Sequence, residues 1–311
     1  MFPKSYAAHI KRIYLLLAIV FVIYGFNTVL EDSASFSIEN IFFTSYLEFF
    51  LAVALSLSSY LLRTIRWLYF ILRYKQEYQS KYFHSLVYLS GFAFTITPGK
   101  TGELVRGIYL KPLGIPLTYT TACFISERTC DLFVVGLLAS LVLFSLDMQA
   151  LPLFFIIILS FFYISIYNVE RIPFFKSKNN LRVLFQNIKD NLKVKKLFTP
   201  LYLTATAWIF QGLVLVVFAN YLEVDISSTM LISIYCSGLI IGALSLMPSG
   251  IGATELGILF LLTQLGVSEK DAILLSIGSR AFTLLPALIL GLLCSLILSI
   301  KKRTRQLHSF K

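Results

Sequence analysis

The sequence predicts an all-α polytopic membrane protein, and three observations lead to this fold class. Of the 311 residues, 57% are hydrophobic and only 14% are charged, whereas soluble domains are about a quarter charged. The hydrophobic residues form continuous blocks, several of which reach the roughly 20 residues that a helix needs to cross a bilayer. These blocks do not alternate with polar residues as the strands of a membrane β-barrel do. A water-soluble enzyme and a β-barrel are both excluded.

Six of the hydrophobic blocks are expected to cross the membrane completely. They lie near Ile13–Leu30, Phe42–Leu62, Tyr119–Leu146, Leu151–Tyr167, Thr199–Tyr221 and Ala272–Ile300. The first block follows Lys4, Lys11 and Arg12 and lacks a small-residue cleavage site, so we expect an uncleaved anchor and not a removed signal peptide.

The loop charges predict the orientation in the membrane. Residues 169–198 hold eight lysines and arginines, and the tail after residue 300 is also basic. The first loop between spans instead holds Glu31, Asp32 and Glu39. Because short cytoplasmic loops collect Lys and Arg, both termini are expected in the cytoplasm, with the protein in the cell membrane. The net charge of +11 thus reflects membrane electrostatics and not nucleic-acid binding.

Two further hydrophobic regions, residues 83–109 and 231–265, are each interrupted near the middle by Pro and Gly. A simple hydropathy count would make them the seventh and eighth spans. Such a break frees backbone N–H and C=O groups that lipid cannot satisfy, so it is tolerated only where it lines a polar cavity or is packed in protein. Each region is therefore predicted to be a re-entrant hairpin with its tip inside the membrane.

The two broken regions resemble each other. Segments that begin at Glu103 and Glu255 align without a gap and share Gly114/Gly266 and Arg128/Arg280 among other positions. Just upstream, Pro98-x-x-x-Gly102 matches Pro248-x-x-x-Gly252. Three full spans between the hairpins would bring the second hairpin in from the opposite face. The expected architecture is an inverted repeat, residues 1–148 and 149–311, with three spans and one hairpin in each half, as in many secondary transporters.

The first hairpin tip gathers polar residues between apolar flanks. These are Pro98, Lys100, Thr101, Gly102, Glu103 and Arg106. Thr101 is a candidate cap for the outgoing half-helix, whose N-terminus would favour a phosphate, and Lys100 and Arg106 would add positive charge. The alternative is an ordinary interfacial turn with a snorkelling lysine.

The third span carries Glu127, Arg128 and Asp131 near the expected bilayer centre. Their spacing places them on one side of the helix, where Asp131 is within reach of both Arg128 and Glu127. Ionisable groups at such depth are costly and mark a functional site by default, although a structural ion pair is the rival interpretation. Arg280 has no acid near it in its own span, so its partner would be Glu255, Glu103, Asp131 or a bound anion.

Arg63 and Arg66 follow the second predicted span. With Arg73 they form the basic face of an amphipathic segment, which we expect at the cytoplasmic interface. They would contact a lipid head group there, or simply anchor the chain.

The second tip contains Pro248, Gly250, Gly252 and Glu255. Its small residues allow close approach of a ligand or a helix, and Gly238-x-x-x-Gly242 just before it favours helix packing. Glu255 is not explained by packing. Glu103, Glu127 and Glu255 are candidates for ion coupling.

No known catalytic motif is present, and no loop is long enough to hold a separate catalytic domain. The four cysteines and three histidines are scattered, so neither a disulfide framework nor a zinc site is expected. We predict no catalytic residue and no cofactor, and no enzyme unless its active site lies within the membrane.

The combined motifs resemble a known family. They are Arg63-x-x-Arg66, Pro98-x-x-x-Gly102-Glu103-x-x-Arg106, Glu127-Arg128-x-x-Asp131 and Pro248-x-Gly250-x-Gly252, followed by Glu255 and Arg280. The pattern is similar to that of the lysylphosphatidylglycerol synthase transmembrane-region family, which includes the flippase domain of multiple-peptide-resistance proteins. The resemblance extends over nearly the whole chain.

This resemblance implies a flippase or transporter that moves an anionic lipid or lipid-linked head group between leaflets. The alternative is an intramembrane lipid-modifying transferase or its subunit, similar to phosphatidylglycerol lysyltransferase or acting in a glycolipid or polysaccharide pathway. A third class is a scaffold for a neighbouring synthase. The chain stops at Lys311, without the soluble aminoacyl-transfer domain of bifunctional members, so synthase activity is not expected. The expected partners are an anionic lipid, the membrane, possible synthase or transferase proteins and further copies of the chain.

Overall fold

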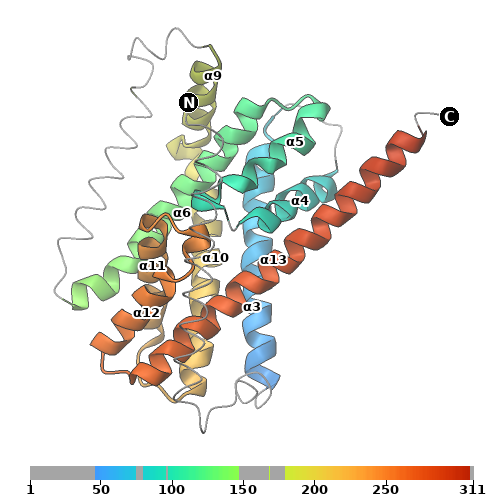
Figure 1. The fold of residues 1–311 in the computed structure, drawn as a ribbon. Coiled ribbons are helices and arrows are strands. Elements are labelled where there is room, and N and C mark those ends of the chain that lie inside the picture. The colour runs from blue at the N-terminus through green and yellow to red at the C-terminus, as the bar shows by residue number, and fades with distance from the viewer. Residues whose placement is uncertain (1–45, 75–79, 96, 147–167, 169–178, 309–311) are drawn as a thin grey trace, which may run out of the picture.

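The regular secondary structure in the described part of the chain consists only of helices (Figure 1). The computed structural model describes residues 46–74, 80–95, 97–146, 168 and 179–308, and their side chains except at 98–101, 144 and 301–308. The predicted spans Ile13–Leu30 and Leu151–Tyr167 lie outside these ranges. The all-α prediction is confirmed for the described residues, and the number of spans stays a prediction.

Four long helices form the body of the protein. They are α3 (Tyr46–Ile71), α6 (Leu117–Ser145), α10 (Val194–Tyr221) and α13 (Glu269–His308). Three of them, α3, α10 and residues 269–300 of α13, are both long and apolar enough to cross a membrane. With 29 residues α6 is also long enough, at roughly 40 Å, but it carries Glu127, Arg128 and Asp131. These lengths and compositions are those expected of a protein that crosses the membrane several times.

The first broken region folds as a chain of short helices. It runs through α4 (Lys81–Ser90), η1 (Gly91–Phe94), η2 (Pro98–Val105), α5 (Arg106–Leu110) and η3 (Lys111–Leu113). Ser80 caps α4, because its hydroxyl accepts a hydrogen bond from the Phe83 N–H at 3.2 Å. Pro98 begins η2, where its missing N–H leaves no helical bond unmade.

The second broken region consists of α11 (Ser228–Leu244), η5 (Pro248–Gly250) and α12 (Ala253–Gln264). Gly238 and Gly242 face α12, where an added Cβ would collide with Ile258 and Thr254, so the predicted packing role of these glycines is confirmed. In Figure 1, α4 and α5 lie nearer the top of the view, and α11 and α12 lie nearer the bottom.

Both broken regions end in the same way. Gly114 and Gly266 have φ angles of 81° and 86°, in the left-handed region that favours glycine. The Gly114 N–H donates to the Lys111 carbonyl at 3.1 Å, and the Gly266 N–H donates to the Thr263 carbonyl at 3.0 Å. These residues occupy equivalent positions in the sequence alignment of the two segments.

Helices of the two predicted repeats, residues 1–148 and 149–311, pack against each other, and each hairpin's first helix contacts the other repeat. Helices α3 and α10 pack against each other, α4 packs against α13, and α11 packs against α6. The two hairpin tips, η2 and η5, also meet. The Ser249 hydroxyl donates to the Thr95 carbonyl at 2.9 Å and so ties the second tip to the first.

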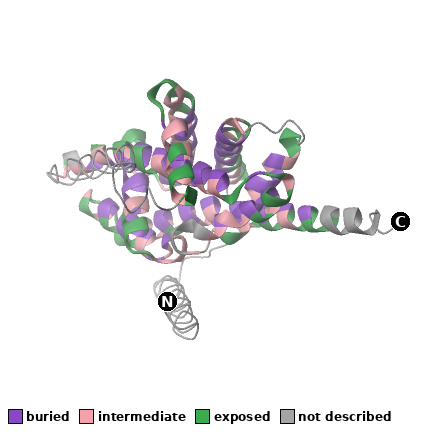
Figure 2. Cartoon of the chain, turned by 90° about the horizontal axis from the view of Figure 1, so that it is seen from above, coloured by how far each residue is buried: buried purple, intermediate pink, exposed green. Residues whose placement is uncertain are grey.

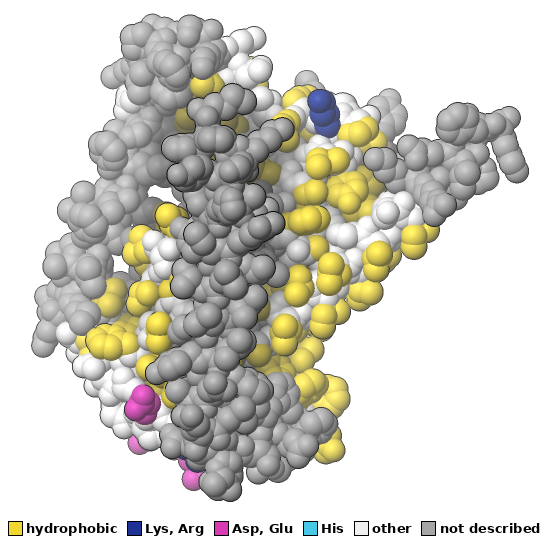
Figure 3. Space-filling view, viewed as in Figure 1, with side chains coloured by type: hydrophobic (Ala, Val, Ile, Leu, Met, Phe, Trp, Pro, Cys, Tyr) yellow, Lys and Arg dark blue, Asp and Glu magenta, His cyan; other side chains and the backbone are white. Residues whose placement is uncertain are grey.

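Hydrophobic side chains fill the interior and also cover much of the outer surface. Figure 2 shows the buried residues where the helices meet. Leu47, Leu61, Leu137 and Ile289 are among the large side chains that point outward. On the face seen in Figure 3, hydrophobic atoms lie on both sides of the grey atoms, and the few charged ones lie near the top and bottom edges. This distribution fits a protein surrounded by lipid.

Helix α9 (Asn179–Asn191) forms part of the predicted basic loop and packs against α6. Asp190 lies at its end, where Lys193 Nζ and Lys196 Nζ approach its carboxylate at 2.6 and 2.8 Å. The hydrogen bonds from Lys193 and Lys196 lower the pKa of Asp190. The two lysines are thereby partly neutralised at the start of α10.

Candidate functional site

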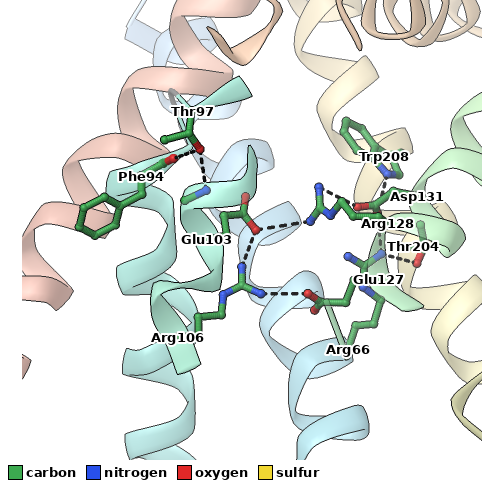
Figure 4. Close-up of polar contacts among 11 residues, drawn as sticks. Arg66, Phe94, Thr97, Glu103, Arg106, Glu127, Arg128, Asp131, Thr204 and Trp208 are labelled. Carbon is green, nitrogen blue, oxygen red and sulfur yellow. Dashed lines mark hydrogen bonds and ion pairs between the residues drawn. The ribbon is translucent and has the colours of Figure 1, made fainter. Parts of the chain in front are cut away.

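Arg106 joins three helical elements at the first hairpin tip (Figure 4). Its position at the start of α5 brings Nη2 within 2.6 Å of Glu103 Oε2 and Nη1 within 2.9 Å of Glu127 Oε2 on α6. The guanidinium carbon also lies 4.2 Å from the centre of the Tyr88 ring and 5.1 Å from that of Trp67. The side chains of Arg106, Glu103 and Glu127 are at most 2% exposed. Burial of these charged side chains costs desolvation free energy, which their ion pairs must offset.

Arg66 and Arg63 connect α3 to α6 and α10. Arg66 Nη1 donates to Asp131 Oδ1 and to Thr204 Oγ1, each at 2.6 Å. Arg63 Nη2 donates to Gln211 Oε1 at 3.0 Å, and its guanidinium carbon lies 3.9 Å from the centre of the Trp208 ring. Because α3 continues to Ile71, both arginines lie within this helix and face polar partners on its neighbours, while their position at the membrane interface stays a prediction. Both are buried.

Arg128 is the most exposed cation of this group. Its Nη1 lies 3.2 Å from Asp131 Oδ2 and its Nη2 lies 3.6 Å from Glu103 Oε2. The side chain is 26% exposed, whereas those of Glu103 and Asp131 are 2% and 8% exposed. The predicted contact of Arg128 with Asp131 is confirmed. Glu127 pairs with Arg106 and not with Asp131.

At the second tip, Arg280 finds its partner in Glu255. Arg280 Nε lies 3.1 Å from Glu255 Oε1, and Nη2 donates to the Ser249 carbonyl at 3.0 Å. The other Glu255 oxygen accepts the Gly252 N–H at 2.6 Å and so caps α12. Of the four partners considered for Arg280, the structure selects Glu255. This pair occupies the position in the second segment that Glu103 and Arg128 occupy in the first.

The small residues at the tips allow backbone conformations and close contacts that larger side chains would disfavour. Gly250 and Gly252 have φ angles of 66° and 89°, which favour glycine. Pro248 begins η5, as Pro98 begins η2. The Gly102 N–H donates to Thr97 Oγ1 at 2.6 Å, and a Cβ at Gly102 would lie 2.7 Å from the Phe94 carbonyl oxygen. The side chains of Lys100 and Thr101 are outside the described set.

Several residues of the site were not predicted from the sequence. Thr204, Trp208 and Gln211 contribute from α10, and Trp208 Nε1 donates to Asp131 Oδ1 at 3.1 Å. Their spacing of four and then three residues along an otherwise apolar span is the signal that would have found them, since it places polar atoms on one helix face. Ser249 and Tyr88 carry no comparable signal.

The first cluster has more positive than negative charge among its described side chains. Four arginines, Arg63, Arg66, Arg106 and Arg128, face three carboxylates, those of Glu103, Glu127 and Asp131. The nitrogens Arg63 Nε, Arg66 Nε and Nη2, Arg106 Nε and Arg128 Nε have no hydrogen-bond partner among the described residues. Buried donors normally have partners, so an anion would supply both the missing charge and the missing acceptors.

Comparison with known proteins places the chain in a family. The model of the lysylphosphatidylglycerol synthase transmembrane region matches residues 10–291. The chain belongs to this family. That membership confirms the resemblance carried by the tip and α6 motifs.

A curated relative supports the same assignment. The chain is 23% identical over 219 residues to the UPF0104 membrane protein MJ1078 of Methanocaldococcus jannaschii. The match covers 64% of this chain and 91% of the relative. The family and the apolar helices together establish a multi-pass membrane protein.

Proposed function

We propose that this protein moves lipids with an anionic head group between the leaflets of the cell membrane. The observation that carries the proposal is the meeting of the two hairpin tips beside buried arginine–carboxylate pairs, where cations are in excess. Charged groups at this depth are costly and are retained mainly where they line a path for an ion or a polar substrate.

We also propose that the chain is an inverted repeat of residues 1–148 and 149–311, with six full spans, two hairpins and both termini in the cytoplasm. The reciprocal packing of α4 on α13 and of α11 on α6 supports this arrangement. The equivalent ion pairs Glu103–Arg128 and Glu255–Arg280 support it further, as do the equivalent turns at Gly114 and Gly266. Opposed hairpins of this kind place a substrate site near the bilayer midplane.

In the proposed mechanism, Arg128 makes the first contact with the lipid phosphate. Its distances of 3.6 and 3.2 Å to Glu103 and Asp131 are long for charge-assisted hydrogen bonds, so a phosphate oxygen can replace either carboxylate. Arg66 and Arg106 are held more tightly, at 2.6 Å from their carboxylates, and would keep the site positively charged during the exchange. Glu103 and Asp131 then pair with Arg128 again, which allows the lipid to leave.

The remaining predicted residues have supporting roles in this proposal. Arg63 and Lys100 add positive charge, and Thr101 and Gly102 shape the first tip. Pro248, Gly250 and Gly252 shape the second tip, where Glu255 and Arg280 fix the backbone at Ser249.

Transport by the purified protein in vesicles tests the proposal. The vesicles contain a trace of fluorescent phosphatidylglycerol or, in parallel, fluorescent phosphatidylcholine, and a membrane-impermeant quencher reports movement between leaflets. We expect faster movement of phosphatidylglycerol, lost in Arg128→Gln and retained in Arg182→Gln, whose side chain is exposed on α9. Chemical modification of the lipid without redistribution would instead support the transferase alternative. Equal rates for vesicles with and without the protein would contradict the proposal.

A further inference from the structure

We infer that Glu127 is a proton-exchange site, which receives protons from the α4 end of the first hairpin through His84 and Tyr88. Proton exchange at Glu127 stands on the geometry alone. Its coupling to lipid movement rests on the function proposed above.

Glu127 is the least well satisfied carboxylate of the first cluster. Its side chain is fully buried, Oε2 accepts one hydrogen bond from Arg106, and Oε1 has no partner among the described residues. Asp131 also has one oxygen, Oδ2, without a hydrogen-bond partner among the described residues, but Arg128 lies 3.2 Å from that oxygen as an ion pair, and Oδ1 accepts two hydrogen bonds, from Arg66 and Trp208. Since a buried carboxylate is stable as an anion only when it is well paired, Glu127 loses least when it takes up a proton.

Charged and titratable groups surround Glu127 on every element that packs around it. They are Arg66 from α3, Tyr88 from α4, Glu103 from η2, Arg106 from α5, and Cys123, Arg128, Cys130 and Asp131 from α6 itself. The three arginines hold the anionic form, and the burial and the two neighbouring carboxylates oppose it. This balance makes proton binding at Glu127 sensitive to any change in the charge of the site.

Helix α4 carries two buried polar side chains, and the second of them, Tyr88, lies beside the arginine that bonds to Glu127. His84 and Tyr88 are one helical turn apart on α4 and are 2% and 0% exposed, and His84 Nδ1 and Tyr88 Oη lack hydrogen-bond partners among the described residues. The Tyr88 ring lies 4.2 Å from the guanidinium carbon of Arg106, which bonds to Glu127. Toward the N-terminus of α4, Ser80, Lys81 and Tyr82 are exposed. His84 is therefore the first buried proton carrier encountered from that end.

Ordered water is the expected bridge between these atoms, because buried polar groups without protein partners commonly bind it. His84 would take up a proton from the solvent and pass it along water and the Tyr88 hydroxyl to Glu127 Oε1, which returns the imidazole to its original protonation state. No bond other than those to the proton is made or broken.

Protonation of Glu127 would favour the binding of an anion. It removes one negative charge from a cluster in which four arginines already face three carboxylates, so the excess of positive charge grows. Because coupling between two binding events is reciprocal, the arrival of an anionic head group must in turn favour protonation. A proton gradient would then bias the direction in which the lipid moves.

Infrared difference spectroscopy tests proton exchange without any need for transport. A pH step applied to the reconstituted full chain should produce a carboxylic acid C=O band that shifts in deuterated water. We expect Glu127→Gln, which keeps an oxygen for Arg106, to abolish this band. The exposed Glu269→Gln should retain it, and His84→Gln should slow its appearance several-fold. A band of unchanged size in Glu127→Gln would overturn the inference.

Coupling is tested with vesicles that contain fluorescent phosphatidylglycerol and an entrapped pH indicator. An imposed pH gradient should change the rate of lipid movement several-fold, and His84→Gln should reduce this response. Lipid movement that ignores the gradient would refute coupling while the proposed function stands. A Glu127-dependent infrared band without lipid movement would refute the proposed function and leave proton exchange intact.

Discussion

Arg280 Nε lies 3.1 Å from Glu255 Oε1, which joins the start of α12 to the first third of α13. The same arginine donates from Nη2 to the carbonyl of Ser249, the tip residue that also contacts the first hairpin. One ion pair therefore holds together the last helix, the second hairpin and the junction between both tips. Its counterpart, Glu103–Arg128, is longer and more exposed. Glu103–Arg128 is therefore the better candidate for substrate exchange, and Glu255–Arg280 is the better candidate for structural support.

Removal of Arg280 should destabilise the protein. Arg280→Gln leaves the Glu255 carboxylate, which is 12% exposed, without its cation, and loss of one partner of a buried pair costs about 3 kcal/mol. Thermal unfolding in detergent measures the effect. The double variant Arg280→Gln/Glu255→Gln should recover part of the loss, since it leaves no buried charge unpaired. Equal destabilisation of the single and double variants would contradict this assignment.

Ser249 should respond differently to two small substitutions. Its φ of 55° lies in the left-handed region, which is costly for residues other than glycine. Ser249→Ala loses the hydrogen bond to Thr95 and keeps the strain, at a cost of about 1 kcal/mol. Ser249→Gly loses the same bond but relaxes the backbone, so it should unfold at a higher temperature than Ser249→Ala. The reverse order would show that the strain does not matter.

The second hairpin should not tolerate a side chain at Gly242. A Cβ there would collide with the Thr254 hydroxyl on α12 and meet the Gly250 Cα at 3.3 Å. Gly242→Ala should therefore cost about 1–3 kcal/mol through overpacking. Gly278→Ala is the matched control, because no atom lies within 4 Å of a Cβ at that position of α13. Comparison of the unfolding temperatures of both variants with the wild type tests the packing.

The outer ends of the hairpins should be accessible from opposite sides of the membrane. Lys111 follows α5 and Ser268 follows α12, and both are exposed. The four native cysteines are free and buried, so they should give little background labelling. A membrane-impermeant maleimide should label Lys111→Cys from the same side as Asn180→Cys on α9, and Ser268→Cys from the other side only. Labelling of both hairpin ends from one side would refute the inverted repeat.

The sequence predicted the helices and breaks well because Pro and Gly mark where a helix must stop. The expected end of the second hairpin, Leu265, lies one residue beyond the observed end of α12, and the expected third span, Tyr119–Leu146, nearly coincides with α6. Contacts between helices were harder to predict. A helical pattern shows that Arg63 and Arg66 share a face, but not that Gln211 and Asp131 lie opposite it. Likewise, nothing local to Glu127 indicates that Arg106 approaches from another element.

A structure determined in a lipid mesophase that contains phosphatidylglycerol would show whether the site binds a lipid head group. We expect phosphate density between η2 and η5, within hydrogen-bonding distance of Arg128, and its loss in crystals of Arg128→Gln. A structure in which both tips open to bulk solvent on the same face, or in which Arg128 and Arg280 point into hydrocarbon with no phosphate beside them, would contradict this expectation.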